Sequence, residues 1–374
     1  MGRLRGTGHR GGHRRRSRQA VVEFGLPARV GRVLGRAREV ASGGTRLVSR
    51  PDAPLAFVPQ LKPRVWGGER LKARVADPPA EPVGESWELS DVDGSVSATP
   101  DGVPLRELLA RHGDAIVGDG WDPARPGRFP LLVKLLETRQ DLSVQVHPDD
   151  ETAARCGLGP AGKTEAWYVL DAAPGARIWA GLEPGTDRGA LERALARGEV
   201  ARVLHAIEPR AGDAIPVPGG TVHALGAGLE LVEIQQTSDV TFRLWDWGRV
   251  GLDGRPRELH VREALEVIRW DAPPPAPAPP RPVAQDGAAR RRLIDGAPFV
   301  IDELAEFDEG GAPLDTGGRF RIVIPVAGRV LVVTSGGRLE RTAPDLALVP
   351  AAAGRWRLHG SRDARVLLVQ RPPA

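Results

Sequence analysis

The sequence predicts an all-β protein with a few short helices. Its 374 residues include 46 glycines and 35 prolines, which favour tight turns. Short runs of alternating polar and apolar side chains recur along the chain, as strands with one buried face require. The single cysteine, Cys156, excludes an internal disulfide framework and favours a reducing compartment, so we expect a cytoplasmic location. The length allows two domains.

Two neighbouring runs predict strands that carry functional groups. In residues 131–136 (LLVKLL), Lys134 is flanked by leucines, which indicates a buried strand where an unpaired charge would be costly. In residues 141–148 (DLSVQVHP), the alternation places Leu142, Val144 and Val146 on one face and Ser143, Gln145 and His147 on the other. The second run therefore directs an amide oxygen and an imidazole to the same side.

Two further runs supply similar groups. Residues 162–170 (GKTEAWYVL) are aromatic and β-branched, and they begin with Lys163 and Glu165, which period two places on one strand face. Residues 216–226 contain a Pro/Gly turn that delivers His223 at the start of a short strand. Gln145, His147, Glu165 and His223 together offer two nitrogens and two oxygens, a donor set that suits zinc or another borderline divalent ion.

The remaining elements divide the chain. Thr186 and Asp187 predict the cap of a helix over residues 188–198, and residues 261–270 predict another amphipathic helix. Residues 272–282 are dominated by proline and alanine and predict a stiff linker. Short strands are then expected at residues 320–326, 330–334 and 365–370.

These runs resemble those of the type I phosphomannose isomerases in their short bacterial form. The resemblance runs collinearly from about Pro54 to the C-terminus. The matching segments are residues 59–68 (PQLKPRVWGG), 84–90 (GESWELS), 129–136 (FPLLVKLL), 141–150 (DLSVQVHPDD), 162–169 (GKTEAWYV), 218–225 (PGGTVHAL) and 233–249 (EIQQTSDVTFRLWDWGR).

The resemblance implies a zinc-dependent aldose–ketose isomerase without an organic cofactor, which interconverts mannose 6-phosphate and fructose 6-phosphate. It implies one zinc ion per chain, with ligands at Gln145, His147, Glu165 and His223. It also implies two cupin-type jelly-roll barrels, with the metal inside the first. We accordingly expect a catalytic domain at residues 51–270, a linker at 271–289 and a metal-free cupin-like domain at 290–374.

The lysines provide candidates for proton transfer. The chain contains only four, Lys62, Lys72, Lys134 and Lys163, among 52 basic residues, so a retained lysine marks a position where a compact amine matters. Isomerisation requires a base that removes a carbon-bound proton. We assign this role to Lys163, because a nearby metal ion would favour its neutral amine. Lys134 is then the phosphate anchor or the alternative base.

Arg243 is the third candidate cation. It lies in a run that resembles the active-site arginine segment of the family, where it alternates with Thr241 and Trp245. It would bind the substrate phosphate or stabilise enediolate charge, two roles that the sequence does not separate. Phe242, Trp245 and Trp247 are expected to supply an aromatic stacking surface.

Other function classes remain open at this stage. Another metal cupin could act on or sense sugar phosphates, but a redox dioxygenase would favour two histidines and one carboxylate, which Gln145 opposes mildly. A sensor would need no base, and Lys163 distinguishes it from an enzyme. We expect a monomer whose partner is a small sugar phosphate, with no membrane or nucleic-acid partner.

The first 50 residues form a separate, basic extension. They carry thirteen arginines and two glutamates, a net charge of +11, whereas the whole chain carries +4 and the remainder therefore −7. We predict a disordered segment, with a nascent amphipathic helix at residues 21–40. It could be a nucleic-acid or membrane-surface arm, a targeting segment or an extension from a misassigned start. We favour the last, with Val48 as the alternative start, because the family resemblance begins only after it.

Overall fold

The computed structural model describes residues 51–121, 127–159 and 161–372. The predictions for residues 1–50 lie outside this range. The described residues belong to one compact unit. Within the described ranges, no helix is long and apolar enough to cross a membrane.

Two sheets form the first part of the described chain. A six-stranded sheet has the order β1-β2-β5-β12-β7-β10, and a five-stranded sheet has the order β13-β6-β11-β8-β9. The strands are β1 (Gln60–Gly68), β2 (Val83–Leu89), β5 (Leu131–Thr138), β6 (Val144–Val146), β7 (Glu165–Ala172), β8 (Ile178–Leu182), β9 (Leu204–Ile207), β10 (Ala214–Val217), β11 (His223–Leu225), β12 (Leu229–Gln236) and β13 (Phe242–Trp245), with β3 (Asp91–Val92) and β4 (Ser95–Val96) as a separate pair.

Part of the space between these two sheets is apolar. Trp167 of β7 and Leu231 of β12 pack there against Ile178 of β8 and Leu225 of β11. The strands pair antiparallel throughout both sheets. This packing fixes the two sheets face to face, which is the arrangement of a sandwich or a flattened barrel.

A second pair of sheets follows. The six-stranded sheet has the order β14-β15-β16-β23-β18-β21, and the four-stranded sheet has the order β17-β22-β19-β20. The strands are β14 (Arg281–Val283), β15 (Ala289–Asp295), β16 (Val300–Ala305), β17 (Ala312–Asp315), β18 (Arg321–Ala327), β19 (Arg329–Val333), β20 (Arg338–Thr342), β21 (Ala347–Val349), β22 (Arg355–Gly360) and β23 (Arg365–Gln370). The three strands predicted in this region are thus confirmed as β18, β19 and β23.

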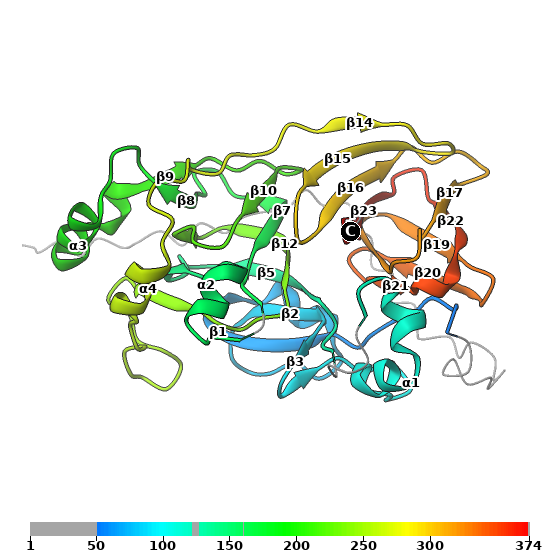
Figure 1. Ribbon diagram of the computed structural model, residues 1–374, viewed down its shortest axis with the longest axis horizontal. Helices are drawn as coiled ribbons and strands as arrows, with labels where there is room; N and C mark the ends of the chain where they lie inside the picture. Colours follow the sequence, from blue (N-terminus) through cyan, green and yellow to red (C-terminus); the bar gives the residue numbers. More distant parts are fainter. Residues whose placement is uncertain (1–50, 122–126, 160, 373–374) are drawn as a thin grey trace, which may run out of the picture. The chain divides into compact units, whose positions relative to one another are not determined.

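The two six-stranded sheets pack against each other through their outer faces. The cluster between them joins Val133 and Ile234 of the first sheet to Ile322 and Leu367 of the second. Figure 1 shows β5, β7 and β12 beside β16 and β23 in the middle of the view. The predicted linker includes β14, so part of it pairs with the second sheet. The division into two domains at this segment stays a prediction.

Helices cover the outer face of the five-stranded sheet. Leu191 of α3 (Arg188–Arg197) and Leu265 of α4 (Val261–Val267) pack against Val144 and Val146 of β6. The helix predicted at residues 188–198 is confirmed, and the Asp187 side chain caps it by accepting from the amide of Ala190 at 2.7 Å.

Two helices were not expected. Helix α1 (Leu105–Val117) buries Leu105, Leu108 and Leu109, which follow the helical period. This leucine spacing is visible in the sequence, but it lies outside the runs that carry the candidate site residues. Helix α2 (Asp150–Arg155) follows the ligand strand β6 directly and is capped by Asp149. Three short 3₁₀ segments complete the described structure at Arg70–Arg74, Val200–Val203 and Ala351–Ala353.

Candidate active site

Three candidate residues lie in one row across the five-stranded sheet. Gln145 of β6 is directly opposite His223 of β11 on one side and Arg243 of β13 on the other. Residues directly opposite in antiparallel strands project to the same face. Gln145, His223 and Arg243 therefore face the interior between the two sheets.

The facing sheet contributes the carboxylate. The ligand atoms of His147, Glu165 and His223 lie within 4.8 Å of one another. One Glu165 oxygen lies 3.6 Å from His147 Nε2, and the other lies 3.2 Å from His223 Nε2. All three side chains are only 1% exposed. The two sheets thus bring together three of the four predicted ligands, and Gln145 is next to them through its pairing with His223.

The orientation of both imidazoles is set by backbone carbonyls. His147 Nδ1 lies 2.9 Å from the carbonyl oxygen of Val240, and His223 Nδ1 lies 2.9 Å from that of Thr221. A carbonyl can only accept, so each Nδ1 donates its proton and each Nε2 keeps a lone pair. That lone pair is directed at the cluster, which is the tautomer that metal-binding histidines adopt.

The Pro-Gly-Gly turn positions His223 because glycine is required at two places. A Cβ on Gly219 would lie 2.6 Å from the backbone of Asp149, and Gly220 has a φ of +83°. The Gly220 amide donates to the carbonyl of His147 at 2.7 Å. The turn therefore fastens the His223 strand to the His147 strand.

The cluster fits a divalent cation. Both oxygens of Glu165 and Nε2 of His223 are buried without a hydrogen-bond partner, which is costly unless another group satisfies them. Burial raises the pKa of Glu165 to about 7 and lowers that of His223 to about 4, and it holds that of His147 well below its ordinary value. Neutral imidazoles beside a carboxylate are the donor set that zinc prefers.

Lys163 lies at this cluster, as predicted. Its Nζ is 2.9 Å from His147 Nε2 and 3.3 Å from a Glu165 oxygen, and the residue is 6% exposed. The reason differs from the predicted one, because strand β7 begins only at Glu165. Lys163 is instead fixed by its own amide, which donates to the carbonyl of Pro148 at 2.9 Å.

A cavity of about 660 Å³ opens beside the cluster. Gln145, Lys163, Lys134 and Arg243 line it. Further lining residues include Arg64, Trp66, Glu85, Trp87, Trp167, Glu233, Asp239, Asp253 and Arg257. Leu142 also lines it and packs between the sheets, so its predicted position beside Val144 and Val146 is wrong. The alternation starts only where β6 begins, at Val144.

Lys134 lines the cavity as half of a buried ion pair. Its Nζ lies 2.7 Å from Glu233 Oε1, and the indole of Trp167 donates to Glu233 Oε2 at 3.1 Å. Burial disfavours the ammonium, but Glu233 and Glu85 outweigh it and raise the pKa of Lys134. Sequence reasoning missed both glutamates. The signal for Glu233 was a carboxylate in the middle of an apolar strand run.

The predicted aromatic surface is wrong. Phe242, Trp245 and Trp247 pack on the outer face of the five-stranded sheet, under the helices. A bulge in β13 between Arg243 and Trp245 turns Trp245 away from the interior. The aromatic side chains that line the cavity are Trp66, Trp87 and Trp167.

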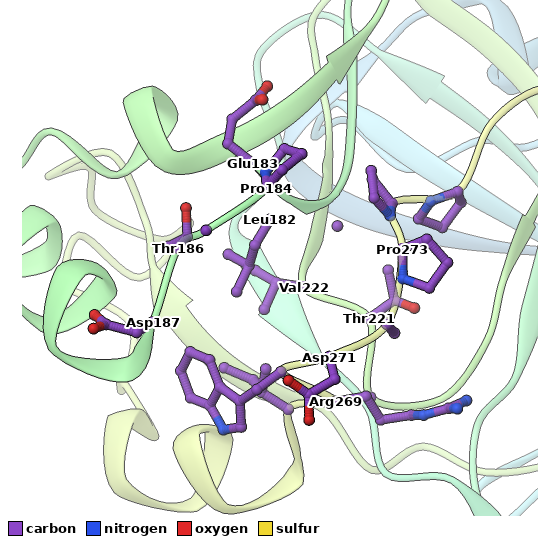
Figure 2. A pocket seen from close by; sticks show the side chains of 18 of the residues that line it. Leu182, Glu183, Pro184, Thr186, Asp187, Thr221, Val222, Arg269, Asp271 and Pro273 are labelled. Atoms are coloured by element: carbon purple, nitrogen blue, oxygen red, sulfur yellow. The ribbon is translucent and has the colours of Figure 1, made fainter.

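A larger cavity, of about 800 Å³, lies on the other side of the His223 turn. Figure 2 shows Thr221, Val222 and Arg269 around it, together with Asp187 at the start of α3. None of the seven predicted site residues lines this cavity. The cavity lined by Gln145, Lys163, Lys134 and Arg243 is therefore smaller than this one.

Comparison with known proteins identifies the family. The catalytic-domain profile of type I phosphomannose isomerase matches residues 55–173. A mannose-6-phosphate isomerase of Streptococcus mutans is 32% identical over 315 residues, which cover 83% of this chain and 96% of that protein. The mannose-6-phosphate isomerase ManA of Bacillus subtilis is 33% identical over 317 residues, covering 84% and 98%.

The fold agrees with a solved structure. The crystal structure of the mannose 6-phosphate isomerase from Bacillus subtilis has a TM-score of 0.75 and 28% identity, and the match covers 85% of this chain and 99% of that one. The all-β fold class predicted from the sequence is confirmed. This chain belongs to the type I phosphomannose isomerase family.

Proposed function

We propose that this protein interconverts mannose 6-phosphate and fructose 6-phosphate. The observation that carries the proposal is the buried His147–Glu165–His223 cluster with the Lys163 amine at its edge, beside a cavity that could admit a sugar phosphate. The names of the relatives support the substrate. We further propose one ion per chain, a monomeric state and a cytoplasmic location.

Zinc is the ion that the donor set favours. Gln145, His147, Glu165 and His223 would hold it, and only one of these four ligands is charged. When bound, zinc would supply Lewis acidity for the oxygens at C1 and C2 of the sugar. The unpartnered oxygens of Glu165 and the free Nε2 of His223 support this assignment.

The chain's own residues then perform the proton transfer. Lys163 in its amine form removes the proton from C2 of the open-chain aldose, and the electron pair shifts to give an enediolate. The proton of the C2 hydroxyl moves to the C1 oxygen, and the ammonium returns its proton to C1, which yields the ketose and restores the amine. Lys134 is unsuited to this role in its paired state, because Glu233 stabilises its ammonium form. Arg243 contributes positive charge on the same sheet face.

The test combines metal content with turnover. Purified protein loaded with zinc should convert fructose 6-phosphate to mannose 6-phosphate, and a chelator should abolish the reaction. His147→Ala should lower the bound zinc measured by elemental analysis and remove activity. His205→Ala is the matched control, because His205 lies on β9 and pairs with Glu183 outside the cavity. Full zinc content and activity in His147→Ala would refute the proposal.

A further inference from the structure

A cluster of three arginines and one aspartate lies at the Arg243 side of the cavity. Asp246 is bound by Arg257, whose Nε donates at 2.7 Å, and by Arg249, whose Nη2 lies 2.8 Å from the carboxylate. Arg243 Nη1 donates to the carbonyl of Glu258 at 2.8 Å, which holds the Arg243 side chain near Arg257 in the same loop. Three guanidinium groups and one carboxylate leave a surplus of two positive charges.

The surplus is not satisfied within the described protein. Arg243 Nε is buried without a hydrogen-bond partner. Burial, with Arg257 and Arg249 nearby, lowers the pKa of Arg243, which indicates a positive local potential. Two aspartates, Asp239 and Asp253, also line the cavity, but both are exposed, where water and salt screen their charge. A buried positive surplus of this kind favours an anion.

The distance between Arg243 and the metal-ligand cluster matches the distance between the two ends of the substrate. Arg243 and His223 are the outer members of the row through Gln145, so two strand spacings separate them, about 10 Å. The bond to Glu258 holds the Arg243 guanidinium toward the 246–260 loop. The reacting carbon atoms and the phosphate of an open-chain hexose 6-phosphate are similarly far apart, at opposite ends of the molecule.

The other cations of the cavity are already neutralised. Lys134 is paired with Glu233, and Arg64 donates to Glu85 at 2.8 Å. Lys163 lies among the metal-ligand candidates. The arginine cluster therefore remains as the place for a dianion. Of its members, Arg243 and Arg257 line the cavity.

We propose that Arg257, brought to the cavity by the 246–260 loop, binds the phosphate of the substrate together with Arg243. Nε and Nη2 of Arg257 donate to Asp246, so its Nη1 group and the unpartnered Nε of Arg243 remain as donors to a phosphate. Asp246 is a positioning residue that orients Arg257. Leu252 and Asp253 of the same loop also line the cavity. This inference rests on the proposed function.

The test separates phosphate recognition from turnover in the zinc-loaded enzyme. Arg257→Gln should raise KM for fructose 6-phosphate at least tenfold, with kcat changed less than threefold. Inorganic phosphate should inhibit the parent enzyme competitively, and Arg257→Gln should weaken that inhibition about tenfold. With fructose, which lacks the phosphate, Arg257→Gln and the parent enzyme should give the same rate. Arg255→Gln is the matched control, because Arg255 is exposed on the same loop and does not line the cavity.

Different failures have different meanings. An inactive parent enzyme that still binds inorganic phosphate through Arg257 in a calorimetric titration would refute the proposed function and keep the anion site. Unchanged phosphate inhibition in Arg257→Gln, or an equal loss on fructose, would refute the role of Arg257. If Arg257→Gln does not fold, Arg257→Lys decides the question, because it keeps the positive charge and removes the guanidinium. Weaker phosphate inhibition with a normal rate on fructose supports the proposal. Unchanged phosphate inhibition refutes recognition by the Arg257 guanidinium.

Discussion

The two pairs of sheets share an architecture and differ in what lies between them. Between the second pair, Val332, Trp356, Leu358 and Leu368 fill the interior with apolar side chains. Between the first pair, apolar packing occupies only part of the space, and buried charged groups surround the rest. The one cluster of metal-ligating side chains found in the described ranges lies there.

The difference shows what a functional interior requires. A buried charge is costly unless it is paired, and the first interior pairs Lys134 with Glu233 and Arg64 with Glu85. Glu165, His223 and Arg243 also carry buried atoms without a hydrogen-bond partner, at places where bound groups are expected. The second pair of sheets also buries an acidic side chain, Asp302, and pairs it with Arg290 and Arg292, but in the described ranges it holds no group of metal-ligating side chains.

The strongest test of the first interior is Lys163→Ala. Loss of a proton-transfer group costs about 10³-fold in rate, so kcat should fall by that factor while zinc content stays intact. Steady-state kinetics with elemental analysis would check this. Lys72→Ala is the control, because Lys72 pairs with Glu69 in a 3₁₀ segment outside the cavity. Wild-type kcat in Lys163→Ala would contradict its proposed role.

The second interior should affect stability without affecting chemistry. Leu358 is fully buried, so Leu358→Ala should cost about 3 kcal/mol of the free energy of unfolding. Its kcat/KM should change less than twofold at a temperature where the variant stays folded. Leu231→Ala, in the apolar part of the first interior beside Trp167, should cost a similar amount and also lower activity. Denaturant unfolding and steady-state kinetics on both variants check this prediction. An equal change of kcat/KM in the two variants would contradict the contrast between the interiors.

The pairing of charges in the first interior predicts that the free energy of unfolding decreases at acidic pH. Although burial alone would raise it, Lys134 and Arg64 lower the pKa of Glu85 to about 2. Because the folded-state pKa lies below the unfolded value of 4.5, the contribution is complete above pH 4.5 and disappears as pH falls toward 2. It amounts to about 3 kcal/mol.

The measurement is the free energy of unfolding against pH for the parent protein and Glu85→Gln. The variant should be less stable at pH 6 and should lose less stability between pH 4.5 and pH 2. Parallel curves would show that Glu85 is not held in its charged form. Glu81→Gln is the control, since Glu81 is exposed near the start of the same strand.

The sequence was informative where function depends on local spacing. Gln145 and His147 lie two apart on one strand, and each ligand run carries its own turn or alternation, so their convergence could be predicted. The neighbours of Lys134 and Arg243 could not be predicted. Glu233 reaches Lys134 through sheet pairing, and Arg257 reaches the Arg243 side of the cavity through the geometry of a loop. The misplaced Trp245 has a local cause, a bulge that the residue pattern does not indicate.

A hydrogen bond between the two pairs of sheets should have the smallest effect on stability of the changes considered. The hydroxyl of Tyr168 on β7 donates to Glu303 on β16 at 2.8 Å, and Glu303 is also close to Arg291 and Arg365. Glu303 therefore keeps partners in Tyr168→Phe, and the loss should be only about 1 kcal/mol. A double-mutant cycle with Glu303→Gln would isolate the coupling of the pair.

This pair also tests whether the two interiors unfold together. The apolar packing between the six-stranded sheets is extensive, so Tyr168→Phe should still unfold in one transition by fluorescence and by circular dichroism. Two separate transitions in the variant would mean that this single buried bond decides the coupling. The two regions would then be independent folding units joined by a polar contact, and the division at the proline-rich segment would gain direct support.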